Sequence, residues 1–113
     1  TRKMIRLAEL LYEKSHKKAA LIEYEKAMGM IQEKAAFLEV FLRSSRLYFE
    51  NGRYQESINT IWPFYEIYPG QMSINLALAR SYLKLGNFKK TDSFLKESSS
   101  KIDSIVLDID SAE

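Results

Sequence analysis

The chain has 113 residues, enough for one domain with a buried core, and its 46% hydrophobic and 28% charged residues are typical of a folded protein. A net charge of +2 is too small to indicate nucleic-acid binding, and the absence of cysteine excludes disulfides and thiolate chemistry. No apolar run approaches the roughly 18 residues that a membrane span needs. We therefore expect no membrane span, and a soluble, cytoplasmic location is favoured although the compartment stays undetermined.

The first predicted element is an amphipathic helix. Its apolar residues recur at helical spacing, at Met4, Leu7, Ala8, Leu11 and Tyr12. Polar residues interrupt the pattern at 13–18, and apolar spacing resumes at 19–28. We expect two antiparallel helices joined at Ser15 and His16, with this single histidine as an exposed turn residue.

The second predicted pair follows a connection at residues 29–33, and its first helix spans 35–50. Gly52 ends this helix, because glycine adopts without penalty the left-handed conformation that ends many helices. Pro63 lies well inside the answering helix, where proline removes a backbone hydrogen bond and clashes with the preceding turn. We therefore expect a kink near Asn59 or an early end of that helix.

The third pair repeats the second, with apolar residues over 74–85, a stop at Gly86 and a further apolar pattern over 88–95. Ser98 to Ser100 marks its end. The tail fits both a helix and a strand, and a short packing helix over 102–113 is favoured because helices precede it.

Two stretches of the chain are versions of each other. The stretch 42–54 returns as 76–88, so that Gly52 matches Gly86 and Arg46 matches Arg80 at a constant offset of 34 residues. A fixed period in this range indicates stacked helical hairpins.

The spacing and the residue types at fixed positions resemble the tetratricopeptide repeat (TPR) family. Small residues at Ala8, Ser45 and Ala79 match that pattern, because they let the two helices of a unit approach closely. Ser44, in place of a leucine, and Phe64, in place of a small residue, depart from it. The resemblance implies one all-α domain over 1–113, a right-handed superhelical stack of three TPR-like helix-turn-helix repeats with a short C-terminal helix. The expected repeats are 1–34, 38–71 and 72–105, followed by the packing segment 102–113, with three residues, 35–37, left over between the first two units.

In this family the first helix of each unit lines a concave groove, so the resemblance also implies a set of groove residues. These are Ile5, Glu9, Tyr12 and Glu13 in the first unit, Leu42, Arg43, Arg46 and Phe49 in the second, and Leu76, Arg80, Leu83 and Lys84 in the third. An apolar floor with basic edges favours an acidic, partly apolar peptide or helical segment of another protein as the partner. The alternative, that Arg46 and Arg80 pair with glutamates of the array itself, stays open.

Some TPR proteins hold the acidic C-termini of chaperones in a clamp of lysines and asparagines. Here the corresponding positions carry Ile5, Glu9, Arg43, Ser73 and Ala77. The clamp is absent, so a chaperone tail is not the expected partner.

A second hypothesis is that the chain self-associates, or is an assembly element of a larger repeat protein or complex. The candidate oligomer surface is the aromatic cluster around Pro63, which contains Trp62, Phe64, Tyr65 and Tyr68. Core packing explains this cluster at least as well. An enzyme is the weakest hypothesis, because serines lack a histidine partner and the four glycines form no phosphate loop. We expect no catalytic activity, no cofactor, no metal site and no nucleic-acid partner.

Overall fold

The computed structural model describes residues 1–98, and within that range the secondary structure is entirely helical. The helices are α1 (Arg2–Glu13), α2 (Lys17–Met30), α3 (Leu38–Glu50), α4 (Tyr54–Ile67), α5 (Met72–Lys84) and a last stretch over 88–98; the short 3₁₀ helix η1 (Lys34–Phe37) precedes α3. The all-α prediction is confirmed for these residues. The predicted packing helix at 102–113 lies outside the described residues.

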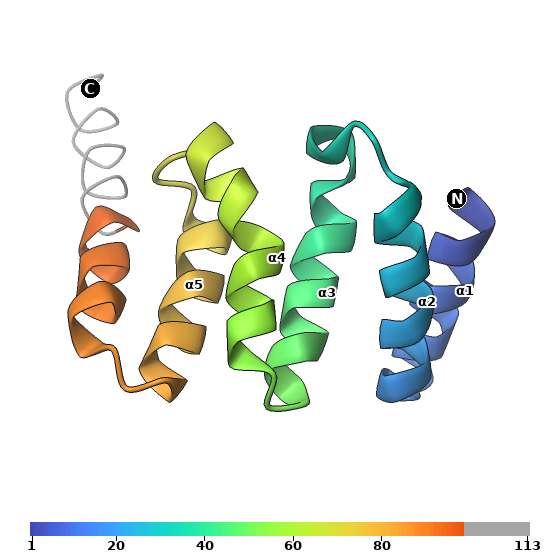
Figure 1. Ribbon diagram of the computed structural model, residues 1–113, viewed down its shortest axis with the longest axis horizontal. Helices are drawn as coiled ribbons and strands as arrows, with labels where there is room; N and C mark the ends of the chain where they lie inside the picture. The colour runs from blue at the N-terminus through green and yellow to red at the C-terminus, as the bar shows by residue number, and fades with distance from the viewer. Residues whose placement is uncertain (99–113) are drawn as a thin grey trace, which may run out of the picture.

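The helices form a row of hairpins, as Figure 1 shows. α1 packs against α2 and α3 against α4, while α5 pairs with residues 88–98 through a hydrogen bond from the Asn75 side chain to the Phe94 carbonyl at 3.2 Å. Between hairpins, α2 packs on α3 and α4 packs on α5. Because each hairpin buries its apolar face on its neighbour, a continuous core runs along the row. The predicted stack of helical hairpins is therefore confirmed.

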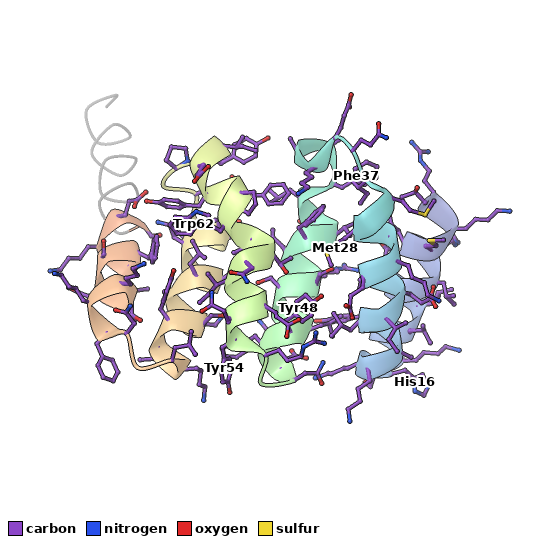
Figure 2. All side chains as sticks on the ribbon, viewed as in Figure 1. His16, Met28, Phe37, Tyr48, Tyr54 and Trp62 are labelled. Atoms are coloured by element: carbon purple, nitrogen blue, oxygen red, sulfur yellow. The ribbon has the colours of Figure 1, made fainter. Side chains whose placement is uncertain are left out.

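The turns inside the three hairpins have the same backbone geometry and lie along the lower edge of the row in Figure 1. The φ angles are 77° at Gly52 and 78° at Gly86, and Ser15 takes the same place in the first turn with a φ of 64°. In each turn the next N–H donates to the carbonyl five residues earlier, at 2.9, 2.8 and 2.9 Å. Ser15 therefore adopts a conformation that glycine takes without steric cost. His16 follows it as an exposed turn residue, as expected (Figure 2).

Small residues allow the helices of each hairpin to approach. In the second hairpin the Ser45 hydroxyl donates to the Ser57 carbonyl at 2.9 Å, and the Ser57 hydroxyl donates to the Ser45 carbonyl at 2.7 Å. In the third, the Thr91 hydroxyl donates to the Ala79 carbonyl at 3.3 Å. The matching positions of the first hairpin are Ala8 and Ala20, both fully buried. The repeat in the sequence is thus a repeat of helix contacts.

Three predicted helix boundaries are wrong. Of the two outcomes predicted for Pro63, a kink near Asn59 or an early end, the early end does not occur: α4 continues to Ile67, since the fully buried side chains of Ile61 and Phe64 anchor it on both sides of the proline. Asn59 is exposed, so water can donate to the carbonyl that Pro63 leaves without an N–H partner. α2 reaches Met30, beyond the predicted connection at 29, and α3 begins at Leu38 rather than 35. The three extra residues of the first unit, 35–37, lie in η1.

Candidate functional site

A hollow of about 310 Å³ opens between α3 and α5. Its lining residues are Leu42, Arg43, Arg46, Ser73, Leu76, Ala77 and Arg80. Residues one repeat apart, such as Leu42 with Leu76 and Arg46 with Arg80, come together here because equivalent helices present equivalent faces to the same side. The structure therefore brings together five of the predicted groove residues.

Ser73 and Ala77 complete the hollow, although they are not among the predicted groove residues. Ser73 lies three residues before Leu76 along α5, and Ala77 lies three residues before Arg80, so each shares a helix face with that residue. Helical spacing alone could have identified them.

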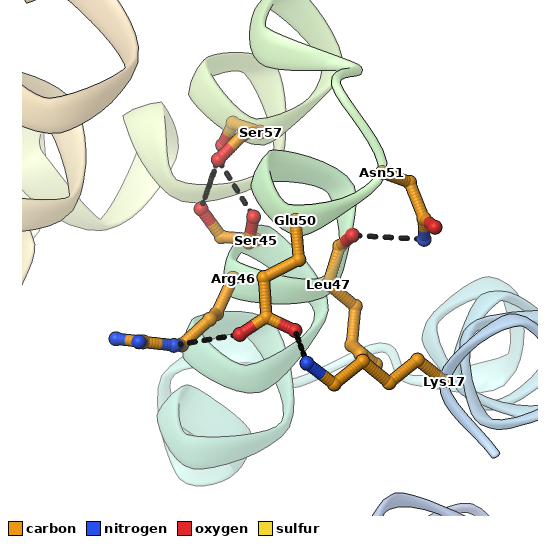
Figure 3. A network of polar contacts seen from close by, with 7 residues as sticks. All are labelled: Lys17, Ser45, Arg46, Leu47, Glu50, Asn51 and Ser57. Atoms are coloured by element: carbon orange, nitrogen blue, oxygen red, sulfur yellow. Dashed lines mark hydrogen bonds and ion pairs between the residues drawn. The ribbon is translucent and has the colours of Figure 1, made fainter. Parts of the chain in front are cut away.

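Arg46 is held by a glutamate of the same chain, as Figure 3 shows. Its Nε donates to Glu50 Oε1 at 3.1 Å, and Lys17 Nζ from the first hairpin lies 2.8 Å from Glu50 Oε2. Burial by itself raises the pKa of the Glu50 carboxyl, but the hydrogen bonds and charges of Lys17 and Arg46 outweigh it and lower the pKa. For Arg46, the alternative of pairing within the array is therefore correct.

Arg80 is placed differently. Its guanidinium lies 5.5 Å from the centroid of the Phe49 ring, and its Nε is buried with no hydrogen-bond partner among residues 1–98. Burial lowers the pKa of the Arg80 guanidinium, and the positive charge of Arg46 lowers it further. A buried donor without an acceptor, next to a second cation, creates an environment that favours an anion.

The groove residues of the first unit lie apart from this hollow. Tyr12 places its ring under the Arg43 guanidinium, 5.6 Å from the ring centroid, which links α1 to the edge of the hollow. Ile5 and Glu9 line a second hollow of about 460 Å³ between α1 and the start of α3, where the charges of Glu9 and Glu39 are balanced by those of Arg2 and Arg6. Among the described residues, the hollow between α3 and α5 is lined by three arginines and no carboxylate, so it fits the acidic partner predicted for the groove better.

The remaining predicted groove residues line neither of these two hollows. Phe49 lies beneath Arg80, while Leu83 and Lys84 are exposed at the end of α5. Glu13 is also exposed, at the end of α1.

The aromatic cluster around Pro63 is mainly an internal contact. Phe64 is fully buried, with its ring centroid 5.0 Å from that of Phe41, so its assignment to an oligomer surface is wrong. The rings of Trp62 and Tyr65 lie 6.3 and 5.2 Å from Phe94, and Tyr65 donates a hydrogen bond to Glu97 at 2.7 Å. These contacts join α4 to residues 88–98 and so hold two hairpins together. Tyr68, the fourth residue of the cluster, is exposed.

Comparison with known proteins adds no family to this geometry. No protein-family model matches the chain, and no curated protein matches it significantly. Across residues 1–98, no helix is both long and apolar enough to cross a membrane. The same part of the chain contains no group of three or more histidine or acidic side chains arranged to hold a metal ion. The site must therefore be interpreted from its own residues.

Proposed function

We propose that this chain is a TPR-like, non-catalytic interaction scaffold that binds an acidic, partly apolar segment of another protein in the hollow between α3 and α5. The helical hairpins, their equivalent turns and the small residues at their crossings support the TPR-like assignment. The arrangement of side chains in the hollow supports the binding role.

The observation that carries the proposal is the state of Arg80. Its buried Nε lacks an acceptor among the described residues, and it lines the same hollow as Arg43 and Arg46. A carboxylate of the partner would supply that acceptor and offset the repulsion between Arg46 and Arg80. Because Arg46 already donates a hydrogen bond to Glu50, Arg80 is the main anchor for the partner's carboxylate, and Arg46 adds positive potential to the hollow.

The apolar part of the partner is inferred from the leucines beside the arginines. Leu76 is exposed and Leu42 is half-buried, and both line the hollow between α3 and α5. A volume of about 310 Å³ is at the small end of the roughly 300–1,000 Å³ of ligand pockets in proteins. This is room for a glutamate or aspartate side chain with part of an apolar neighbour.

The test uses a panel of fluorescein-labelled ten-residue peptides in which glutamates and leucines alternate at different spacings. Matched peptides carry lysine in place of each glutamate, and binding is measured by fluorescence anisotropy. We expect micromolar binding of at least one acidic peptide and weaker binding as salt rises. Arg80→Ala should weaken that binding at least tenfold, because a charge-assisted hydrogen bond contributes about 1.5–3 kcal/mol.

Arg53→Ala is the matched control. Arg53 is an exposed arginine in the turn before α4, it pairs with Glu56, and it does not line this hollow. Its loss should leave the affinity of the acidic peptide within about twofold of the wild-type value. The proposal is wrong if the lysine peptides bind as tightly as the acidic ones, or if Arg80→Ala and Arg53→Ala have equal effects.

A further inference from the structure

The hollow between α3 and α5 has more positive charge than one carboxylate can neutralise. Of the described residues, three arginines and no carboxylate line it. Glu50 is shared by two cations, Arg46 and Lys17, so this group of three side chains keeps one positive charge. Arg80 adds a second positive charge, and its Nε has no acceptor within residues 1–98. A partner carboxylate, with its single negative charge, would leave one of these two charges uncompensated.

The free hydrogen-bond donors of the hollow come from two different helices. The buried Nε of Arg80 belongs to α5, whereas Arg46 belongs to α3 and its outer guanidinium nitrogens point away from Glu50 (Figure 3). Ser73, in the first turn of α5, adds an exposed hydroxyl. A carboxylate has two oxygens in one plane and suits a single guanidinium, whereas a phosphate group has three acceptor oxygens. A phosphate can therefore accept hydrogen bonds from α3 and α5 at the same time.

Arg43 is the least available of the three arginines. Its guanidinium lies over the ring of Tyr12, 5.6 Å from the centroid, and the nearby carboxylates of Glu9 and Glu39 offset part of its charge. Arg43 therefore adds to the positive potential at the edge of the hollow, while the direct contacts of an anion fall to the other two arginines.

We propose that the acidic group of the bound segment is a phosphorylated serine or threonine, with its phosphate between Arg46 and Arg80. The hollow is that of the proposed function, on which this proposal rests. A phosphorylated side chain carries a charge of about −1.5 to −2 at pH 7, which matches the two uncompensated positive charges. The exposed Leu76 and the half-buried Leu42 lie beside the arginines and would contact apolar neighbours in the same segment. The phosphate is therefore part of a polypeptide rather than a free ion.

The test compares three versions of each peptide in the panel described above, in which the central glutamate is kept or is replaced by phosphoserine or by serine. Binding to the full chain is measured by fluorescence anisotropy. The phosphoserine peptide should bind at least about tenfold more tightly than the glutamate peptide, since it gains a further charge-assisted hydrogen bond. Its affinity should fall between about pH 7.5 and 5.5, because the phosphate loses a negative charge near pH 6, whereas that of the glutamate peptide should change less.

Arg46→Lys distinguishes a phosphate from a carboxylate. Lysine keeps the positive charge, but it has a single ammonium group, which Glu50 would engage, in place of a guanidinium with separate donors. The phosphoserine peptide should lose at least about fivefold in affinity, because its phosphate uses both arginines. The glutamate peptide should stay within about twofold of its wild-type affinity, because its carboxylate binds Arg80 and needs only the charge at position 46.

Arg53→Lys is the matched control. The Nε of Arg53 also donates to a glutamate of the same helical region, Glu56, at 2.6 Å, but Arg53 does not line the hollow. This change should leave the affinities of all the peptides unchanged, and far-UV circular dichroism should show the same helical content in both variants.

The outcomes separate this inference from the proposed function. Equal affinity for the phosphoserine and glutamate peptides, with weaker binding of the serine peptide, would overturn the inference and leave the proposed function standing. Equal binding of all three peptides, or binding of none, would overturn both. Tighter binding of the phosphoserine peptide that Arg46→Lys does not reduce would place the phosphate outside this hollow and would also overturn the inference. The comparison of peptides on the wild-type chain remains decisive if the variant loses helical content.

Discussion

Replacing Ser15 with glycine should stabilise the protein, whereas replacing Gly52 or Gly86 with alanine should destabilise it. All three residues hold the left-handed conformation at the end of the first helix of a hairpin, with φ angles of 64°, 77° and 78°. An added Cβ at Gly52 or Gly86 would meet no atom within 4 Å, so the alanine variants introduce no clash with neighbouring atoms. Their effect therefore measures the backbone conformation alone.

The expected size follows from two opposing terms. An L-residue in the left-handed region loses roughly 1–2 kcal/mol relative to the right-handed one. Alanine also restricts the unfolded chain more than glycine does, which offsets about 0.4–1 kcal/mol of that loss. The difference leaves Gly52→Ala and Gly86→Ala less stable by about 1 kcal/mol. Ser15→Gly should be more stable by a similar amount, since Ser15 is exposed and its side chain has no buried contact to lose.

The assay is urea unfolding followed by far-UV circular dichroism, with the free energy of unfolding extrapolated to water. Ser93→Gly is the matched control, because Ser93 is an exposed serine within the helical stretch 88–98. The same chemical change should there cost about 0.5–1 kcal/mol, since glycine destabilises a helix interior. If Ser15→Gly destabilises the protein as Ser93→Gly does, the equivalence of the three turns is refuted.

Three further changes test the core and the ionisable groups. Phe64→Ala should reduce the free energy of unfolding by about 3–5 kcal/mol because Phe64 is fully buried, whereas Phe88→Ala should cost less than about 1 kcal/mol by the same urea assay. Burial and the nearby Glu25 raise the pKa of Tyr48 from 10.0 to about 12. The contribution of this residue to stability should therefore be fully present below pH 10 and be lost as the pH rises to 12. The melting temperature of Tyr48→Phe should fall less than that of the wild type over this pH range. Because the pKa of Glu50 is lowered, its contribution to stability is present above pH 4.5 and is lost as the pH falls below that value. Glu50→Gln should therefore reduce the free energy of unfolding at pH 7 by about 1 kcal/mol or less and make it depend less on pH in the acid range. An unchanged pH dependence in the acid range would contradict the pairing of Glu50 with Lys17 and Arg46.

The hairpins could be predicted from the sequence because their signals are local or strictly periodic. Gly52 and Gly86 mark helix ends through their own backbone freedom, and apolar spacing sets the buried face of each helix. A serine, unlike a glycine, does not indicate a helix end by its residue type. The shift of 37 residues between the expected units 1–34 and 38–71 places Ser15 opposite Gly52, and this shift would have identified it.

The course of α4 through Pro63 could not be predicted from local rules. Proline usually ends a helix, but here buried neighbours hold the chain in place on both sides, and this depends on packing with α3 and α5. The aromatic cluster is a similar case. Its spacing does not say whether it faces outward, and the contacts of Trp62 and Tyr65 with Phe94 come from a segment about 30 residues away.

The sequence alone determined which residues recur on the same side of the row, and so it brought Leu42, Arg46, Leu76 and Arg80 together. It could not distinguish the two arginines, because they occupy equivalent positions in the repeat. Only the tertiary structure decided that Arg46 pairs with Glu50 while the Nε of Arg80 lacks an acceptor within residues 1–98. The physical reason is that periodicity fixes the direction of a side chain, whereas its partner depends on which atoms of other helices come within hydrogen-bonding distance.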